Sequence, residues 1–266
     1  MENAQLLEMI KNNPHVIVSI KEPTEEMKLL AVRKNGLMLQ HIKNPTCEMK
    51  ELAIENNARA IRFVENPTEA MMQKAVEASW INLEYIKEPT EEVIKAALEH
   101  TGWAIKYIEH PSEELQLTAV RKNYDALKFI KEPFESVQEA AVLISYDALR
   151  YLENPTEKAE QLAVKQNAGA ILFVKDLDKN KILEFLKINI LVIKYVRKDI
   201  SKLELEAVLK EVIAREDVDE SYIRNFLNYS TMDQSIMNDL DKILFIYEFG
   251  SRRAKQITVD EKLKFS

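Results

Sequence analysis

The sequence contains little glycine and little cysteine. Of its 266 residues, four are glycine and one is cysteine. Four glycines cannot supply a glycine-rich phosphate-binding loop, and neither G-x-G-x-x-G nor G-x-x-x-x-G-K-[ST] occurs. The single cysteine, Cys47, excludes an intramolecular disulfide framework and a multi-cysteine zinc site. The composition therefore excludes several common nucleotide-binding and metal-binding classes.

Long apolar runs are lacking too. No stretch approaches the ~18 uncharged apolar residues of a membrane span, and the first residues, MENAQLLEMIKNNP, have no basic region and no apolar run typical of a signal peptide. The chain has 37 basic and 44 acidic side chains, which gives a formal charge of −7. We expect a cytoplasmic protein, located in the host cytoplasm if a phage encodes it.

The prolines reveal an internal repeat. Seven of the eight prolines are separated by a constant interval of 22 residues: Pro23, Pro45, Pro67, Pro89, Pro111, Pro133 and Pro155. Self-similarity at a fixed period of this length is typical of a solenoid, in which each unit stacks on its neighbours. The proline is taken as position 1 of each unit.

Each unit is predicted to contain two short helices. The first begins after a Thr or Ser at position 2, such as Thr24 or Ser112, which are good N-caps. Phe134 breaks this column. The second begins after position 13, which is Asn in most units and Ser or Thr in the others. The eighth proline, Pro14, follows Asn13 at a first helical position, where proline is well tolerated.

The apolar columns predict how the units stack. Position 9 is alanine from Ala31 to Ala163, which allows helices to approach closely, and position 17 is Leu or Ile from Leu39 to Ile171. Position 19 is aromatic from Phe63 to Phe173, and we assign it to the core as well. A lone helix of about ten residues is marginal in water, so the helices depend on stacking.

These patterns predict an all-α fold, an α-solenoid of about nine to ten 22-residue helix-turn-helix repeats. Residues 1–22 are predicted to form an N-terminal capping repeat, 23–214 the helical repeat array, and 215–266 a divergent C-terminal helical cap and tail.

The repeat consensus also resembles a known family. The pattern P-[ST]-E-E…AV-x-x-N…I-x-[FY]-I over roughly residues 1–200 is similar to a family of short all-helical repeats known as a domain of unknown function, found in bacteria, phages and some large viruses and protists. The resemblance implies a helical repeat array and supplies no catalytic residues. The organisation of the chain in short helical repeats is also distantly similar to that of HEAT, armadillo and leucine-rich-variant solenoids, which bind partners.

The C-terminal segment departs from the repeat. DESYIRNFLNYS is predicted to form one helix and MDQSIMNDLDKILFIYEF a longer amphipathic one, followed by a basic turn at 250–253 and a polar tail. We interpret the segment as a cap over the last repeat. The alternative is a homodimerisation helix that uses an apolar face made of Leu240, Ile243, Leu244 and Tyr247.

Catalytic chemistry is not visible in the sequence. The four histidines fall at different repeat positions without metal-ligand spacing. Paired carboxylates such as Glu91 and Glu92 stand at helix starts, where the helix dipole explains them. We therefore predict a non-enzymatic protein with no cofactor, no metal and no catalytic residues. The competing hypothesis is an enzyme, or a regulatory subunit of an enzyme, whose active site is completed by the C-terminal segment. A cluster among the following residues would favour it: Tyr222, Asp233, Asp239, Asp241 and Arg252.

The informative surface residues are those that vary between units. If positions 17 and 20 of the second helix are core, then positions 14, 15 and 18 face solvent. In the middle units these positions are unusually aromatic and basic, and they are our predicted partner-binding residues: Trp80, Ile81, Trp103, Lys106, Tyr124, Lys128, Tyr146 and Arg150. Trp, Tyr and Arg often anchor interfaces. The alternative is that the rings only cover the core.

A second anomaly is Leu143-Ile144, where other units carry polar pairs. We interpret it as local core variation rather than as a contact site.

The predicted function is a protein-binding scaffold that holds a protein partner along a ridge or groove of the solenoid. One alternative is a phage-encoded inhibitor that blocks a host defence protein or nuclease, with acidic-surface mimicry as one means. Nucleic acid is a disfavoured partner because the pI is near 5.4 and phosphate binding normally needs a basic footprint.

Overall fold

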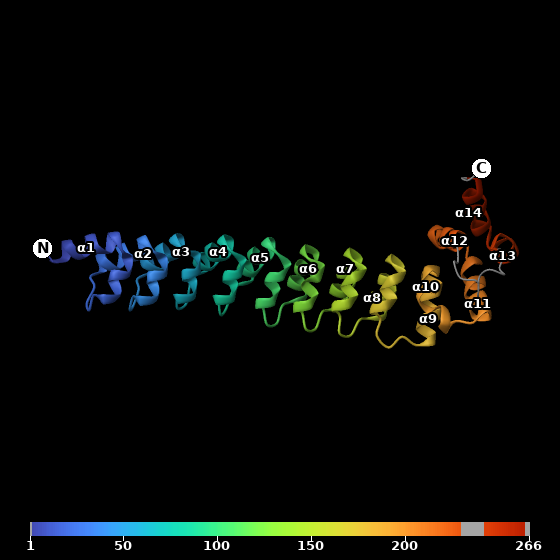
Figure 1. Ribbon diagram of the computed structural model, residues 1–266, viewed down its shortest axis with the longest axis horizontal. Helices are drawn as coiled ribbons and strands as arrows, with labels where there is room; N and C mark the ends of the chain where they lie inside the picture. Colours follow the sequence, from blue (N-terminus) through green and yellow to red (C-terminus); the bar gives the residue numbers. More distant parts are fainter. Residues whose placement is uncertain (1, 230–241, 264–266) are drawn as a thin grey trace. The chain divides into compact units, whose positions relative to one another are not determined.

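The computed structural model describes residues 2–229 and 242–263 (Figure 1). Every regular element within these ranges is helical. The chain divides into two compact units, Met1–Pro133 and Phe134–Ser266. The predicted all-α repeat fold is therefore confirmed, and each unit is described by itself.

The first unit alternates α-helices with short 3-10 helices, labelled η. Its elements are α1 (Glu2–Asn12), η1 (Pro14–Ser19), α2 (Glu25–Lys34), η2 (Gly36–His41), α3 (Cys47–Asn56), η3 (Ala58–Phe63), α4 (Glu69–Ala78), η4 (Trp80–Tyr85), α5 (Glu91–His100), η5 (Gly102–Tyr107), α6 (Glu113–Lys122) and η6 (Tyr124–Phe129). The α-helices stack side by side in chain order (Figure 1).

The second unit begins with the same alternation and then changes. Its repeat elements are α7 (Glu135–Ile144), η7 (Tyr146–Tyr151), α8 (Glu157–Gln166), η8 (Ala168–Phe173), α9 (Lys179–Ile188) and η9 (Ile190–Val192). The elements that follow are α10 (Ile193–Val196), η10 (Arg197–Asp199), α11 (Lys202–Ile213), α12 (Glu220–Asn228), α13 (Lys242–Phe249) and α14 (Arg252–Leu263). Within the described ranges there are thus eight regular pairs, α1/η1 to α8/η8, rather than nine to ten.

One residue at position 13 ends the α-helix and begins the 3-10 helix. Asn35 has an extended backbone, its N–H donates to Ala31 O at 2.9 Å, and its side-chain Oδ1 accepts from Leu37 N at 3.1 Å. Most of the 22-residue repeats have this double cap, although Ser79 and Asn123 make no side-chain cap hydrogen bond. The shared cap leaves no linker between the two helices, and the second is a six-residue 3-10 helix.

The predicted N-caps of the α-helices are confirmed. Thr24, for example, accepts a hydrogen bond from Met27 N at 3.3 Å. Phe134 cannot do this, and α7 begins without a side-chain cap bond.

Small residues allow neighbouring repeats to pack closely. The alanines of position 9 are fully buried from Ala31 to Ala163. At position 14, a Cβ added to Gly36 or Gly102 would overlap with the carbonyl oxygen of Ala53 or Ala119 in the next repeat. Polar side chains complete these junctions: Gly36 N donates to Asn56 Oδ1 at 2.7 Å. The junction between repeats is therefore both tight and hydrogen-bonded.

The C-terminal helices pack against the last repeat within the second unit. The buried Tyr222 hydroxyl of α12 donates to Leu186 O of α9 at 3.0 Å, and α11 contacts α9. Residues 252–263, predicted as part of a basic turn and a polar tail, form the helix α14; Ser251 Oγ accepts from Ala254 N at 3.1 Å and caps this helix. Only residues 242–249 of the predicted long amphipathic helix are described, as α13, and Leu240 lies outside the described ranges.

Within the described ranges, none of the helices combines the length and the apolar character needed to cross a membrane.

Candidate partner-binding surface

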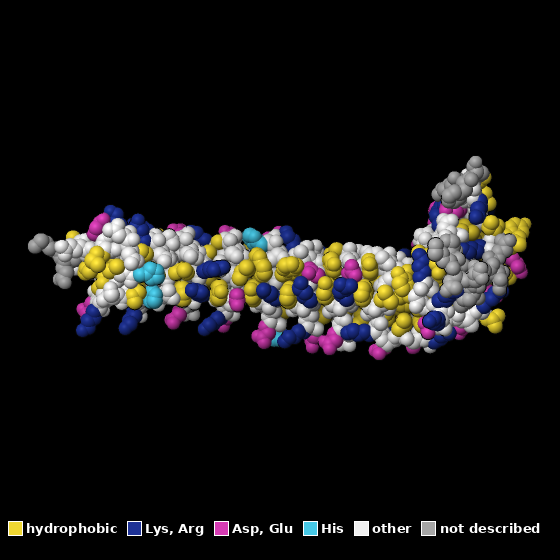
Figure 2. Space-filling view, in the orientation of Figure 1, with side chains coloured by type: hydrophobic (Ala, Val, Ile, Leu, Met, Phe, Trp, Pro, Cys, Tyr) yellow, Lys and Arg dark blue, Asp and Glu magenta, His cyan; other side chains and the backbone are white. Residues whose placement is uncertain are grey.

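The structure divides the predicted partner-binding residues between the two units. Six lie on η4, η5 and η6 of the first unit: Trp80, Ile81, Trp103, Lys106, Tyr124 and Lys128. Tyr146 and Arg150 lie on η7 of the second unit. Over the stacked repeats, hydrophobic side chains are interleaved with lysines and arginines (Figure 2). The exposed side chains of η3 to η6 are called the ridge below.

Lys128 connects η5 and η6 across one junction. Its Nζ lies 4.6 Å from the centroid of the Trp103 ring in the preceding repeat and 5.0 Å from that of Phe129 in its own repeat. It also donates to Asp125 Oδ2 at 3.1 Å, while the Trp103 indole N–H donates to Asp125 Oδ1 at 2.8 Å. Trp103 is nevertheless 40% exposed, so this network fixes an indole on the surface.

Lys106 makes the equivalent bridge between η4 and η5. Its Nζ lies 5.3 Å from the centroid of Trp80 and 4.5 Å from that of Tyr107. The rings of Trp80 and Tyr107 are themselves 6.1 Å apart and tilted by 41°. The two bridges follow one rule: a position-18 lysine covers an aromatic ring of the preceding repeat and the position-19 ring of its own.

The electrostatics of Asp125 follow from this network. Partial burial raises the pKa of the Asp125 carboxyl, but the hydrogen bonds from Trp103 and Lys128 outweigh burial and hold the pKa below its ordinary value. The carboxylate therefore stays charged and keeps the indole and the ammonium in place.

The prediction of exposed and buried positions needs two corrections. Position 14 is wrong as a solvent-facing column, because Gly36, Gly102 and Ala168 are buried there and Trp80 is half-buried. Position 19 is wrong as a core column, because Tyr85 and Phe129 are 37% and 36% exposed. The reason for the burial of position 14 is the helix type: a 3-10 helix has three residues per turn, so position 14 eclipses the buried position 17.

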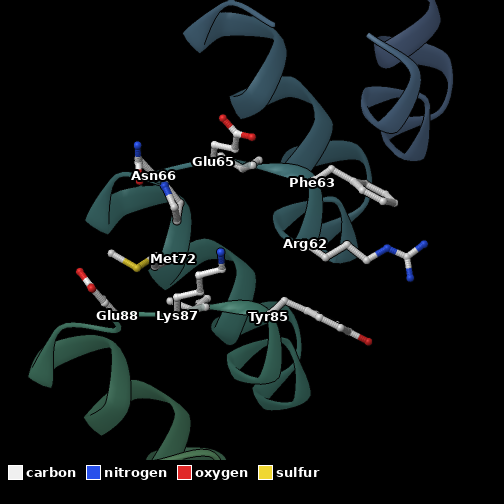
Figure 3. Close-up of a pocket in the computed structure, with 11 residues that line it drawn as sticks. Arg62, Phe63, Glu65, Asn66, Met72, Tyr85, Lys87 and Glu88 are labelled. Atoms are coloured by element: carbon white, nitrogen blue, oxygen red, sulfur yellow. The ribbon is translucent and has the colours of Figure 1, made fainter. Parts of the chain in front are cut away.

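The sequence reasoning missed Arg62, Phe63 and Tyr85. The Arg62 guanidinium carbon lies 4.5 Å from the centroid of the Phe63 ring. These residues border a pocket of about 750 Å³ between the loops that follow η3 and η4. Figure 3 shows Arg62, Phe63 and Tyr85 on one side of this pocket, and Glu65 and Asn66 on the other. The aromatic column at position 19 was the sequence signal that could have identified Phe63 and Tyr85.

In the second unit, η7 carries a similar arrangement. Arg150 pairs with Asp147 at 3.6 Å, and its guanidinium carbon lies 4.7 Å from the centroid of Phe173 in the next repeat. Tyr146 is half-buried, and its N–H donates to Gln166 Oε1 at 2.6 Å. Leu143 and Ile144 are 61% and 49% exposed, so the interpretation of this pair as core variation was wrong.

The residues of the competing enzyme hypothesis do not form a described site. Burial raises the pKa of Tyr222, whose hydroxyl is already engaged by a main-chain carbonyl. Arg252 is exposed at the start of α14, and Asp233, Asp239 and Asp241 lie outside the described ranges. Among the residues described, no group of three or more His, Cys, Asp or Glu side chains is placed to hold a metal ion.

The alternative dimerisation face is described in part. On α13, Ile243, Leu244 and Tyr247 are exposed, whereas Phe245 and Ile246 are buried. Homodimerisation stays a prediction.

Comparison of the chain with protein-family models, with curated proteins and with solved structures gave no match.

Proposed function

We propose that the protein is a non-enzymatic scaffold that binds a protein partner along the ridge of η3 to η6. The observation that carries the proposal is the surface network of Trp103, Lys128 and Asp125. Its indole is 40% exposed although both polar partners hold it in one orientation. A rigid, partly exposed aromatic side chain loses little conformational entropy on binding, which is why Trp and Tyr are frequent interface anchors.

The repetition of this arrangement supports the proposal. Lysines at the same position of η5 and η6 cover rings from two successive repeats. Covering the core requires only apolar contact, whereas Trp103 and Phe129 are 40% and 36% exposed and share the ammonium group of Lys128. Such a surface offers aromatic, cationic and hydrogen-bonding groups within one stretch of the solenoid.

A pull-down with the full chain tests the proposal. The wild type is compared with a Trp80→Ala/Trp103→Ala/Tyr124→Ala variant, and circular dichroism checks that both are folded. We expect the variant to lose the partner. The matched control is Leu203→Ala, because Leu203 is 78% exposed on α11 and lies off the ridge. A partner that all three proteins retain equally overturns the proposal.

We also infer that the repeats are divergent members of the family of short helical repeats that they resemble. The support is the regular series of units about 22 residues apart, each an α-helix followed by a 3-10 helix. A solved structure of a repeat of that family with a long α-helix in place of the 3-10 turn would contradict this inference.

A further inference from the structure

The cations of the ridge fall into two groups. Lys128 is paired with Asp125, whereas Arg59, Arg62 and Lys106 form no ion pair with any residue that the structure describes. Arg62 lies over Phe63 and Lys106 over Tyr107, each with 4.5 Å between the cationic centre and the ring centroid. A cation held on an aromatic face still presents donors on its outer side, and a carboxylate is the partner those donors prefer.

The charge of the ridge is opposite to that of the chain. The helices η3 to η6 carry four basic side chains (Arg59, Arg62, Lys106 and Lys128) and two acidic ones (Glu84 and Asp125), a net charge of +2. The whole chain has a net charge of −7. An acidic partner is therefore attracted to this surface although the chain as a whole is acidic, which favours docking at the ridge.

The arrangement favours an acidic protein segment over a nucleic acid. Binding of single strands relies on open aromatic faces on which bases stack. On the ridge, Lys106 already covers Trp80 and Tyr107, and Lys128 covers Trp103. Glu84 and Asp125 also interrupt the row of positive charge that a phosphate backbone would follow.

The spacing of the two unpaired cations that lie over aromatic rings sets the geometry of the ligand. Arg62 and Lys106 are 44 residues apart, which is two repeats. Neighbouring packed helices are about 8–10 Å apart, so the two cations are separated by roughly 16–20 Å. An extended chain rises about 3.3 Å per residue, so about five or six residues span this distance. Between the cations lie Ile81, 42% exposed, and Tyr85, 37% exposed, together with Glu84.

Building on the proposed scaffold function, we propose that the ridge binds an extended acidic segment of a protein partner. Two carboxylates of the segment, about five or six residues apart, pair with Arg62 and Lys106. The residues between them are uncharged and apolar or aromatic, because they contact Ile81 and Tyr85 and must avoid repulsion by Glu84.

Fluorescence anisotropy with synthetic peptides tests the proposal on the full chain. The probe is a fluorescein-labelled peptide with two glutamates about five residues apart around a Leu/Phe core. The controls are the same composition with adjacent glutamates, a version with lysines in place of the glutamates, and fluorescein-labelled oligothymidylate. We expect the spaced acidic peptide to bind most tightly and its affinity to fall as salt is added.

Variants of the three cations give the sharper result. Arg62→Gln and Lys106→Gln should each weaken binding about threefold to fivefold, as for partly exposed ion pairs. The matched control is Lys128→Gln, which removes the same charge from the same column but a cation already paired with Asp125; its effect should be smaller.

Three results overturn the proposal: no binding of the spaced peptide, equal weakening by all three variants, or tighter binding of oligothymidylate. These failures are distinct from failure of the scaffold function. If the tryptophan variant loses its protein partner while Arg62→Gln and Lys106→Gln keep it, the scaffold stands and the acidic ligand is wrong.

Discussion

The junctions between repeats and the ridge on their surface obey opposite rules. At the junction, position 9 is a fully buried alanine in every repeat from Ala31 to Ala163. At position 15 of the 3-10 helices, by contrast, the residues vary widely in size, charge and polarity: Leu37, Arg59, Ile81, Trp103, Asp125, Asp147 and Gly169. Stacking requires the same shape at each step, whereas solvent-facing positions carry no such requirement. Stability is therefore distributed along the stack, whereas the recognition that we propose involves only a few repeats.

The largest effect should come from breaking a junction. Gly102→Ala places a Cβ against the Ala119 carbonyl oxygen, which is backbone and cannot move aside. We expect a loss of about 1–3 kcal/mol in the free energy of unfolding, measured by urea denaturation followed by circular dichroism. Gly169→Ala is the control, because its Cβ would meet only side-chain atoms at 3.1 Å. Equal losses in both variants would contradict the importance of close approach at the junction.

A smaller loss should follow from removing a polar bridge across the same junction. Asn123 Oδ1 accepts from Gly102 N at 2.8 Å and from Thr101 Oγ1 at 3.1 Å. Asn123→Ala leaves these donors without that acceptor and should cost about 1–2 kcal/mol. Asn123→Asp retains an acceptor and should recover part of the loss. No recovery in the same urea titration would show that the side chain acts by packing rather than by hydrogen bonding.

On the ridge, truncation should affect stability less than either junction change. Trp103→Ala removes a partly exposed ring and one cation–π contact, which is worth about 0.5–1 kcal/mol at an exposed site. We expect an unfolding free energy within about 1 kcal/mol of wild type, together with loss of partner binding. A loss as large as that of Gly102→Ala would mean that the ridge is a continuation of the core.

The smallest effect should be the pH response of Asp125. Its folded-state pKa is lowered, so the charged carboxylate stabilises the fold above the unfolded-state pKa of about 4. This contribution is lost as the pH falls through the lower folded-state value. In a Trp80→Phe background, Trp103 fluorescence should show an acid transition with a midpoint below pH 4.

Asp125→Asn is the control for this measurement and should abolish the transition. A midpoint unchanged by Asp125→Asn would assign the signal to another group.

Much of the fold was predictable because its determinants are local. Thr24 caps α2 through its own side chain, and Asn35 ends α2 and starts η2 through contacts within a few residues. The candidate site was predicted less well. Trp103 and Lys128 are 25 positions apart in the chain, and only stacking brings the ammonium to 4.6 Å from the ring centroid.

The C-terminal segment also depends on contacts between distant residues that the sequence did not predict. Residues 252–263 were predicted as part of a basic turn and a polar tail, yet they form α14, where Asn228 Nδ2 of α12 donates to the Glu261 carboxylate at 2.7 Å. The partner residue lies 33 positions earlier, so no local pattern marks the contact.

The sequence by itself determined the repeat length, the helix starts and the buried alanine column, because caps and stacking depend on residue type at fixed spacing. Only the tertiary structure decided that the second helix is a 3-10 helix. That helix, with three residues per turn instead of 3.6, places position 14 over the buried position 17. The tertiary structure also decided which rings the position-18 cations cover. Those contacts join two repeats, so they depend on how each repeat is rotated against the next.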